Sequence, residues 1–71
     1  MLIKGIISSV NIADNTAELI LPEYDNVVTS KTPFYQKNRA QTVSIGECVI
    51  IAIFNDDFTD MIIIWGDSIW N

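Results

Sequence analysis

The stretch that decides the fold is VSIGECVIIAIFNDDFTDMIIIWG, residues 43–66. It contains two apolar runs, Cys48–Phe54 and Met61–Trp65, and a polar connection between them, Asn55–Asp60. Ile and Val dominate both runs, and side chains that branch at Cβ favour the extended backbone of a strand. Each run is also shorter than a typical helix, so the sequence predicts a β-hairpin with a fairly long connection.

Neither run alternates between apolar and polar residues, as a strand with one face in water does. In the first run, one face carries Val49, Ile51 and Ile53, and the other carries Cys48, Ile50, Ala52 and Phe54. In the second run, Met61, Ile63 and Trp65 oppose Ile62 and Ile64. Continuous apolar runs indicate burial on both faces, and 71 residues provide too little chain for a second layer. We therefore predict that another chain covers the outer face.

The length of the chain also points to association. A single domain of 71 residues buries only about 60% of its unfolded surface, and domains of this size usually need a further source of stability. The single Cys48 excludes an internal disulfide, and one Cys without any His excludes a structural zinc site. Oligomerisation remains as that source. We expect Cys48 itself to be a buried core thiol, which suits a reducing compartment.

The charge of the chain argues against nucleic-acid binding. Four Lys or Arg against nine Asp or Glu give a net charge of −5, whereas neutralising phosphates requires clustered positive charge. The alternative is a base-stacking platform in and around the middle loop, as OB-folds use for single strands. Its members would be Tyr24, Phe34 and Tyr35 with Lys31, Lys37 and Arg39.

Targeting and membrane signals are not found in the sequence. The start, Met1 to Gly5, lacks the basic and apolar regions of a signal peptide. No apolar run approaches the 18 or so residues that a membrane span requires. We therefore expect neither a secretory signal nor a span.

The polar connection Asn55–Asp60 gathers carboxylates and amides, as sites for hard cations do. It lacks the glycine and the distal Glu of an EF-hand loop, so we interpret it as a solvated turn and expect no metal or cofactor. Asp56 and Asp57 are neighbours in a turn, and such neighbours rarely converge on one substrate atom. A nucleophilic Cys48 would need a base, and the chain contains no His. We expect no enzymatic activity.

The first half of the chain reads as three further strands. Leu2–Val10 is interrupted by Gly5, and a glycine inside a strand often marks a bulge or a barrel corner. Thr16–Leu21 ends at Pro22, which has no N–H to donate to the sheet. Val27–Thr32 follows as an edge-like strand.

Five short strands with a bent first strand predict a small closed barrel, because closure removes exposed sheet edges. We predict one all-β domain over residues 1–71, a five-stranded OB-like Greek-key barrel, with an SH3-like barrel as the alternative. Residues 34–42 are polar and form either a loop or a short helix, of which we favour the loop. The turns that define the fold are expected at Gly5, Pro22, Gly46 and Gly66.

A longer pattern runs through these strands. It comprises Gly5-x-Ile7-x-x-Val10, Leu19-x-Leu21-Pro22-Glu23-Tyr24-Asp25-Asn26, Thr32-Pro33-Phe34, Ile45-Gly46-Glu47-x-Val49-x-Ile51 and a last strand closing on Gly66. The pattern resembles the OB domain of phage tail spike and baseplate proteins of the gene-product-V type. The related OB domain of the VgrG proteins of type VI secretion is similar. The resemblance extends over roughly residues 3 to 66.

The resemblance implies a structural protein of a phage tail or tail-like particle, located in the virion tail after assembly in the host cytoplasm. In that family the OB domain is usually trimeric and links the tube to the spike. Its members continue into a β-helical needle, whereas these 71 residues account only for the barrel. We therefore expect an oligomeric hub, plug or adaptor at the distal tail tip or baseplate, bound to other tail proteins. We expect no membrane insertion by this chain alone.

The contact surface is expected among the apolar residues of the hairpin and the tail. Aromatic residues dominate the energetics of protein interfaces, so Trp65 and Trp70 are candidates, together with Ile50, Ile62 and Ile64. Which alternate residues face inward stays open, since a single bulge moves the following residues to the other face. The alternative function for such a barrel is a small nucleic-acid-binding protein.

Overall fold

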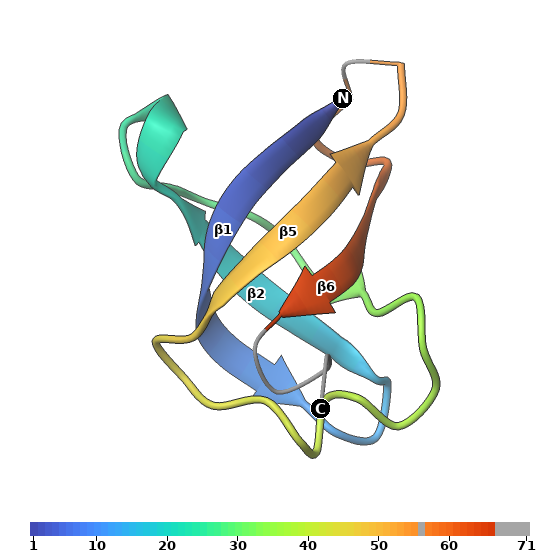
Figure 1. The fold of residues 1–71 in the computed structure, drawn as a ribbon. Coiled ribbons are helices and arrows are strands. Elements are labelled where there is room, and N and C mark those ends of the chain that lie inside the picture. Colours follow the sequence, from blue (N-terminus) through green and yellow to red (C-terminus); the bar gives the residue numbers. More distant parts are fainter. Residues whose placement is uncertain (56, 67–71) are drawn as a thin grey trace.

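The computed structural model describes residues 1–55 and 57–66. Six strands form one sheet, and this sheet coils into a barrel (Figure 1). The elements are β1 (Leu2–Asn11), β2 (Thr16–Leu21), the 3-10 helix η1 (Pro22–Tyr24), β3 (Val27–Val28), β4 (Thr32–Pro33), β5 (Cys48–Ile53) and β6 (Met61–Gly66). The prediction of a small all-β barrel is confirmed. In the described part of the chain, no helix has the length and apolar character needed to cross a membrane.

The strand order is that of a Greek key. Neighbours follow the path β3-β2-β1-β5-β6, β4 also pairs with β2, and the paired strands are antiparallel. β5 thus returns to lie beside β1, as the fourth strand of a Greek key does. A parallel bridge between Phe34 and Ile63 connects the chain after β4 to β6. The N–H of Tyr35 donates to the carbonyl of Ile63 (2.8 Å), which supports this closure.

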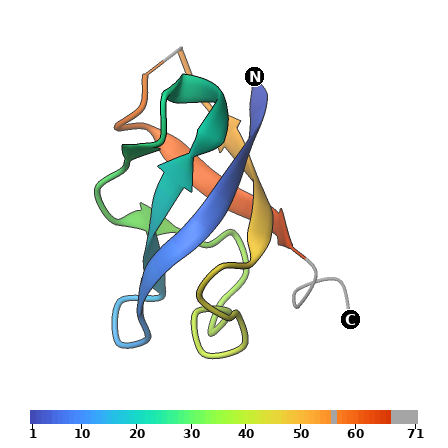
Figure 2. The ribbon, with the colours of Figure 1, turned by 90° about the vertical axis from the view of Figure 1, so that its left-hand side faces the viewer.

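β1 bends, and its two ends pair with different strands of the barrel. Residues 2–6 pair with β5, and residues 6–11 pair with β2. Figure 2 shows β1 running from the N-terminal end of the barrel to the turn at the opposite end. The register shifts between Ile7 and Ser9, which leaves Ser8 as an extra residue in the strand. Such a bulge bends a strand and increases its twist, and closing a small barrel requires both.

The predicted third strand, Val27–Thr32, is divided into β3 and β4, which pair with different ends of β2. Thr29 lies between them and is buried. Its Oγ1 accepts a hydrogen bond from the N–H of Leu19 (3.1 Å), and its own N–H donates to the carbonyl of Leu19 (2.8 Å). A side chain therefore replaces a backbone group in the ladder, and the strand is interrupted. Residues 35–47 form turns without a helix, so the loop favoured for this region is present.

The interior is filled by alternate residues of the strands. From the hairpin, Val49, Ile51, Ile53, Met61 and Ile63 are buried. They pack with Ile3, Ile7, Ala17, Leu19, Leu21, Phe34 and Ala40. This fixes the orientation that the sequence left open. The expectation of a buried Cys48 is wrong, because Val49 takes the inward position and the Cys48 side chain is exposed.

The turn residues named from the sequence have different local roles. Gly5 lies inside β1, Pro22 opens η1 directly after β2, and Gly66 is the last residue of β6. Gly46 has a φ of 91°, in the left-handed region that favours glycine. Its N–H donates to the carbonyl of Ile7 (2.8 Å), so the turn before β5 is attached to β1.

Candidate functional site

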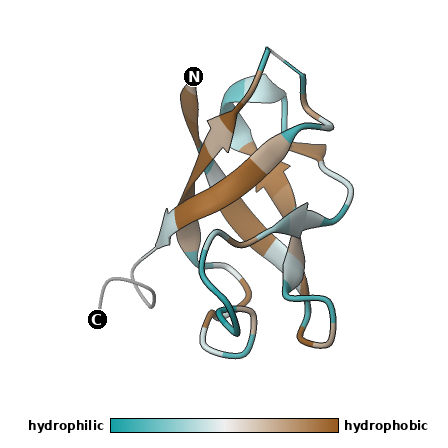
Figure 3. Cartoon of the chain, turned by 90° about the vertical axis from the view of Figure 1, so that its right-hand side faces the viewer, coloured by the Kyte–Doolittle hydropathy of each residue, from teal (hydrophilic) through white to brown (hydrophobic). Residues whose placement is uncertain are grey.

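The outward side of β1, β5 and β6 carries neighbouring apolar side chains. Directly opposed residues of antiparallel strands share a face, and the register places Ala52 between Leu2 and Ile62. In the next outward row, Ile50 lies between Lys4 and Trp65. We call this surface the outward face; it consists of Leu2, Lys4, Ile6, Cys48, Ile50, Ala52, Ile62, Ile64 and Trp65. Figure 3 shows the hydrophobic colouring of these strands.

The side chains of the outward face are only partly covered. Leu2 is 64% exposed, and Ile50 and Ile62 are half-buried, whereas Ile51 and Ile63 of the inner face are 0% and 1% exposed. Scattered apolar residues are normal on a protein surface, but a contiguous apolar patch marks an interaction site. The outward face is such a patch, and Lys4 is its only charged member.

A bulge in β6 decides where Trp65 lies. Ile51 pairs with Ile63 and Ile50 pairs with Trp65, so Ile64 is the extra residue. At such a bulge two residues of one strand oppose one residue of the other. The sequence alternation placed Trp65 on the face of Met61 and Ile63, and this part of the prediction is wrong. The bulge moves Trp65 to the outward face beside Ile64.

The structure brings together four residues that the sequence named as contact candidates, Ile50, Ile62, Ile64 and Trp65. The fifth, Trp70, lies outside the described residues. Sequence reasoning missed Leu2 and Ile6, which β1 adds to the same face. Pairing between β1 and β5 joins segments more than forty residues apart, and no pattern within either strand specifies it. The alternation of Leu2, Lys4 and Ile6 with buried Ile3 and Ile7 was the available signal.

A hollow of about 350 Å³ lies in the outward face. It is lined by Leu2, Ile3, Lys4, Glu23 and Ile50. Leu2, Ile3 and Ile50 make it apolar, while Lys4 and Glu23 bring opposite charges to it. Among the described residues, an ion pair is present between Lys31 and Asp14 (3.0 Å). Lys4 and Glu23 do not form an ion pair with each other.

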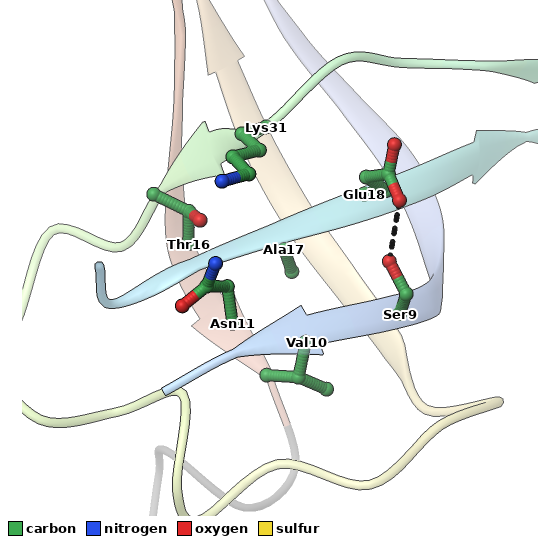
Figure 4. A pocket seen from close by; sticks show the side chains of 7 residues that line it. All are labelled: Ser9, Val10, Asn11, Thr16, Ala17, Glu18 and Lys31. Carbon is green, nitrogen blue, oxygen red and sulfur yellow. Dashed lines mark hydrogen bonds between the residues drawn. The ribbon is translucent and has the colours of Figure 1, made fainter. Parts of the chain in front are cut away.

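A second hollow, smaller and polar, has a volume of about 160 Å³ and is lined by residues of β1 and β2 and by Lys31 (Figure 4). Ser9 Oγ donates to Glu18 Oε1 (2.7 Å), and Lys31 Nζ binds Asp14. Thr16 Oγ1 is buried without a partner among the described residues, and Figure 4 places it between Asn11 and Lys31. The lining carries the carboxylate of Glu18, and its one ammonium, that of Lys31, is already paired with Asp14, so the hollow is unsuited to phosphate.

The base-stacking platform, which the sequence offers only as the alternative, is not assembled in the described part of the chain. Phe34 is buried in the core. Tyr24 packs against Phe58, with ring centroids 5.0 Å apart and ring planes at 72°. Tyr35 is 71% exposed, and Lys31 is held by Asp14. Successive bases require several exposed rings beside unpaired cations, and these residues provide one such ring.

The polar connection between β5 and β6 is a turn with local hydrogen bonds. The Asp57 carboxylate accepts bonds from Thr59 Oγ1 (2.7 Å) and from the Thr59 N–H (2.9 Å). These bonds hold the pKa of Asp57 below its ordinary value of 3.8, the hydroxyl bond having the larger effect. Within residues 1–55 and 57–66, no three His, Cys, Asp or Glu side chains gather as a metal site. Asp56 lies outside the described residues.

Comparison with known proteins identifies no relative of this chain, so the outward face is the main guide to its function. No protein-family model matches the chain, and no curated protein or solved structure matches it significantly.

Proposed function

We propose that this protein is a structural component of a phage tail or tail-like particle. It acts as an oligomeric OB-like hub, plug or adaptor at the distal tail tip or baseplate. The observation that carries the proposal is the outward face, where apolar residues of three strands lie side by side and only partly covered. Stable subunit interfaces resemble a domain core cut in half. The proposed role is to match the symmetry of neighbouring proteins through this apolar face, and it needs no catalytic group.

Several residues must act together on this face. Full burial of one Ile side chain contributes about 1.5–3 kcal/mol, and half-buried side chains contribute only part of that. Association costs roughly 4–15 kcal/mol in lost freedom of motion. A single exposed Ile cannot offset such a cost. The row Leu2–Ala52–Ile62 and the row that ends at Trp65 supply the area that one residue lacks.

The resemblance to tail OB domains supports the location and the trimer. Its residues lie at points that shape this barrel, such as the Gly46–Glu47 turn attached to β1 through Ile7. The carbonyl of Glu47 accepts a hydrogen bond from the N–H of Ile7 (2.9 Å), and the N–H of Gly46 returns one to the carbonyl of Ile7. A three-fold ring of such barrels would match the symmetry of a tail tip.

Light scattering on two matched variants tests the association. Ile62→Glu places a charge on the outward face, and Ile12→Glu places the same charge at a residue that is 63% exposed in the turn after β1. We expect a wild-type trimer that resists high salt, a folded monomer for Ile62→Glu, and a trimer for Ile12→Glu. Circular dichroism checks that both variants fold. A wild-type protein that stays monomeric at every concentration contradicts the proposal.

Electron microscopy tests the location. Particles from a producing culture are labelled with an antibody raised against this chain and examined by negative staining. We expect label at the end of the tail distal to the head. Label confined to the head, or recovered only with free protein, contradicts a role in the tail tip or baseplate.

A further inference from the structure

The polar hollow of about 160 Å³ shares no lining residue with the outward face. Two directly opposed residue pairs of β1 and β2 line it, Ser9 with Glu18 and Asn11 with Thr16. A hollow needs only about 10–15 Å³ to hold one water, whereas pockets for drug-sized ligands begin at about 300 Å³. The size of this hollow therefore suits a group between the two, such as the end of one side chain.

One end of the hollow presents hydrogen-bond donors. Lys31 Nζ donates to Asp14 Oδ2 (3.0 Å), and an ammonium has two further N–H groups. Asn11 Oδ1 accepts from the N–H of Asp14 (3.1 Å), and Figure 4 shows the amide nitrogen of Asn11 turned towards the hollow. Between these two lies the Thr16 hydroxyl, which is buried without a partner among the described residues. An acceptor at this end would meet donors of all three side chains.

The other end of the hollow presents hydrogen-bond acceptors. Ser9 Oγ donates its one proton to Glu18 Oε1 (2.7 Å), so the Ser9 oxygen offers only its lone pairs to a further partner. The carboxylate of Glu18 accepts at both of its oxygens. A group with two N–H donors at this end would therefore find an acceptor for each of them.

The charge of the lining discriminates between ligands. Asp14 neutralises the Lys31 ammonium, which leaves the carboxylate of Glu18 as the net charge of the hollow. Glu18 would repel an anionic ligand, and a cationic ligand would meet the donors Lys31 and Asn11 at the opposite end. A neutral group with an acceptor on one side and donors on the other meets neither penalty. A carboxamide is such a group.

We infer that the polar hollow binds the terminal carboxamide of an Asn or Gln side chain from a partner protein. The carbonyl oxygen of this group faces Thr16, Asn11 and Lys31, and its NH₂ group faces Ser9 and Glu18. A backbone peptide group has only one N–H and continues in both directions, so it fits a hollow of this size badly. The inference goes beyond the proposed function, because it assigns a partner contact to a surface separate from the outward face.

Titration of the full chain with small probes, followed by amide NMR, tests the inference. Acetamide, acetate and acetamidinium have nearly the same shape but are neutral, anionic and cationic, and N-methylacetamide keeps the amide but lacks one N–H. Ligands with so few atoms bind weakly, so each probe is titrated to about 0.5 M. We expect saturating shifts at residues 9–11 and 16–18 with acetamide and at least about fivefold weaker binding of N-methylacetamide. We expect no saturation with acetate or acetamidinium.

Matched variants assign the binding to the two ends of the hollow. Thr16→Val removes the unpartnered hydroxyl at nearly constant shape, and Thr42→Val makes the same change at an exposed residue of the loop before β5. Glu18→Met removes the carboxylate at the acceptor end, and Glu23→Met is its control on η1. We expect the affinity for acetamide to fall at least about fivefold in Thr16→Val and in Glu18→Met. We expect both controls to bind like the wild type.

Four results would overturn the inference. Acetamide shifts that do not saturate mean that the hollow holds water only. Equal binding of acetate or acetamidinium means that the amide is not what is recognised, and equal binding of N-methylacetamide points to a backbone peptide group instead. Wild-type affinity in Thr16→Val contradicts the donor end. None of these results changes self-association through Ile62, which tests the proposed function separately.

Discussion

Gly5 of β1 lies so close to Ile51 of β5 that a Cβ added to Gly5 would be 2.6 Å from Ile51 Cδ1. Ile51 is fully buried, so β1 at Gly5 lies directly on the core. The added atom would also lie 3.6 Å from the Cβ of Leu19, in ordinary contact. Ile51 is therefore the residue that limits what position 5 can hold.

Gly5→Ala is expected to destabilise the barrel by about 1–3 kcal/mol, because the methyl group overpacks the core. The measurement is urea unfolding in the Ile62→Glu background, which we expect to be monomeric, so that association does not contribute. Ile51→Val removes the clashing Cδ1 and by itself costs about 0.5–1.5 kcal/mol. The double variant Gly5→Ala with Ile51→Val should lose less than the sum of the two. Strict additivity contradicts the packing relationship.

Two threonines whose hydroxyl oxygens are buried, Thr29 and Thr16, are expected to respond in opposite ways to an isosteric change. Thr29→Val leaves the N–H of Leu19 without its acceptor, and a buried unsatisfied donor costs about 1–3 kcal/mol. Thr16 Oγ1 is buried without a partner among the described residues, so Thr16→Val should leave stability unchanged or raise it. Denaturant unfolding of both variants checks this. Equal losses in the two variants contradict the hydrogen-bond assignment.

The pKa of Asp57 is expected to lie below 3.8 in the folded protein and to rise in Thr59→Val. The Thr59 hydroxyl is the larger cause of the lowered pKa, and the bond from the Thr59 N–H remains in the variant. A carboxyl whose folded pKa is lowered stabilises the fold above its unfolded pKa and loses this contribution as pH falls through the folded pKa. Carboxyl-detected NMR titration of both proteins measures the pKa directly. An unchanged Asp57 pKa in the variant is the contrary result.

Cys48 is expected to report whether the outward face is covered. Its thiol is exposed in the single barrel and is the only one in the chain. A thiol reagent should modify it readily in dilute protein and more slowly at concentrations where the protein associates. In Ile62→Glu the rate should not depend on protein concentration. A wild-type rate that is equally independent of protein concentration contradicts the prediction, because it means that association does not cover the Cys48 thiol.

Local residue chemistry was sufficient to predict the strands of the hairpin and their turn. Ile and Val restrict the backbone to extended conformations wherever they occur in a run, and β5 and β6 lie within one residue of the predicted bounds. β2 matches its prediction because Pro22 ends the ladder for a reason contained in one residue. The division of the third strand was not predictable in this way. It depends on the Thr29 hydroxyl meeting the N–H of Leu19, which requires the fold.

The sequence by itself determined that the chain forms short strands, that these close into a small all-β barrel, and that the hairpin is apolar on both sides. These properties follow from backbone preference and from hydrophobic composition, which act locally. Only the tertiary structure decided which side faces the core. The bulge at Ile64 moved Trp65 outward, and pairing with β5 brought Lys4 beside Ile50. Side-chain direction alternates with every residue of a strand, so one extra residue or one change of register reverses it, and register is fixed only when the strands meet.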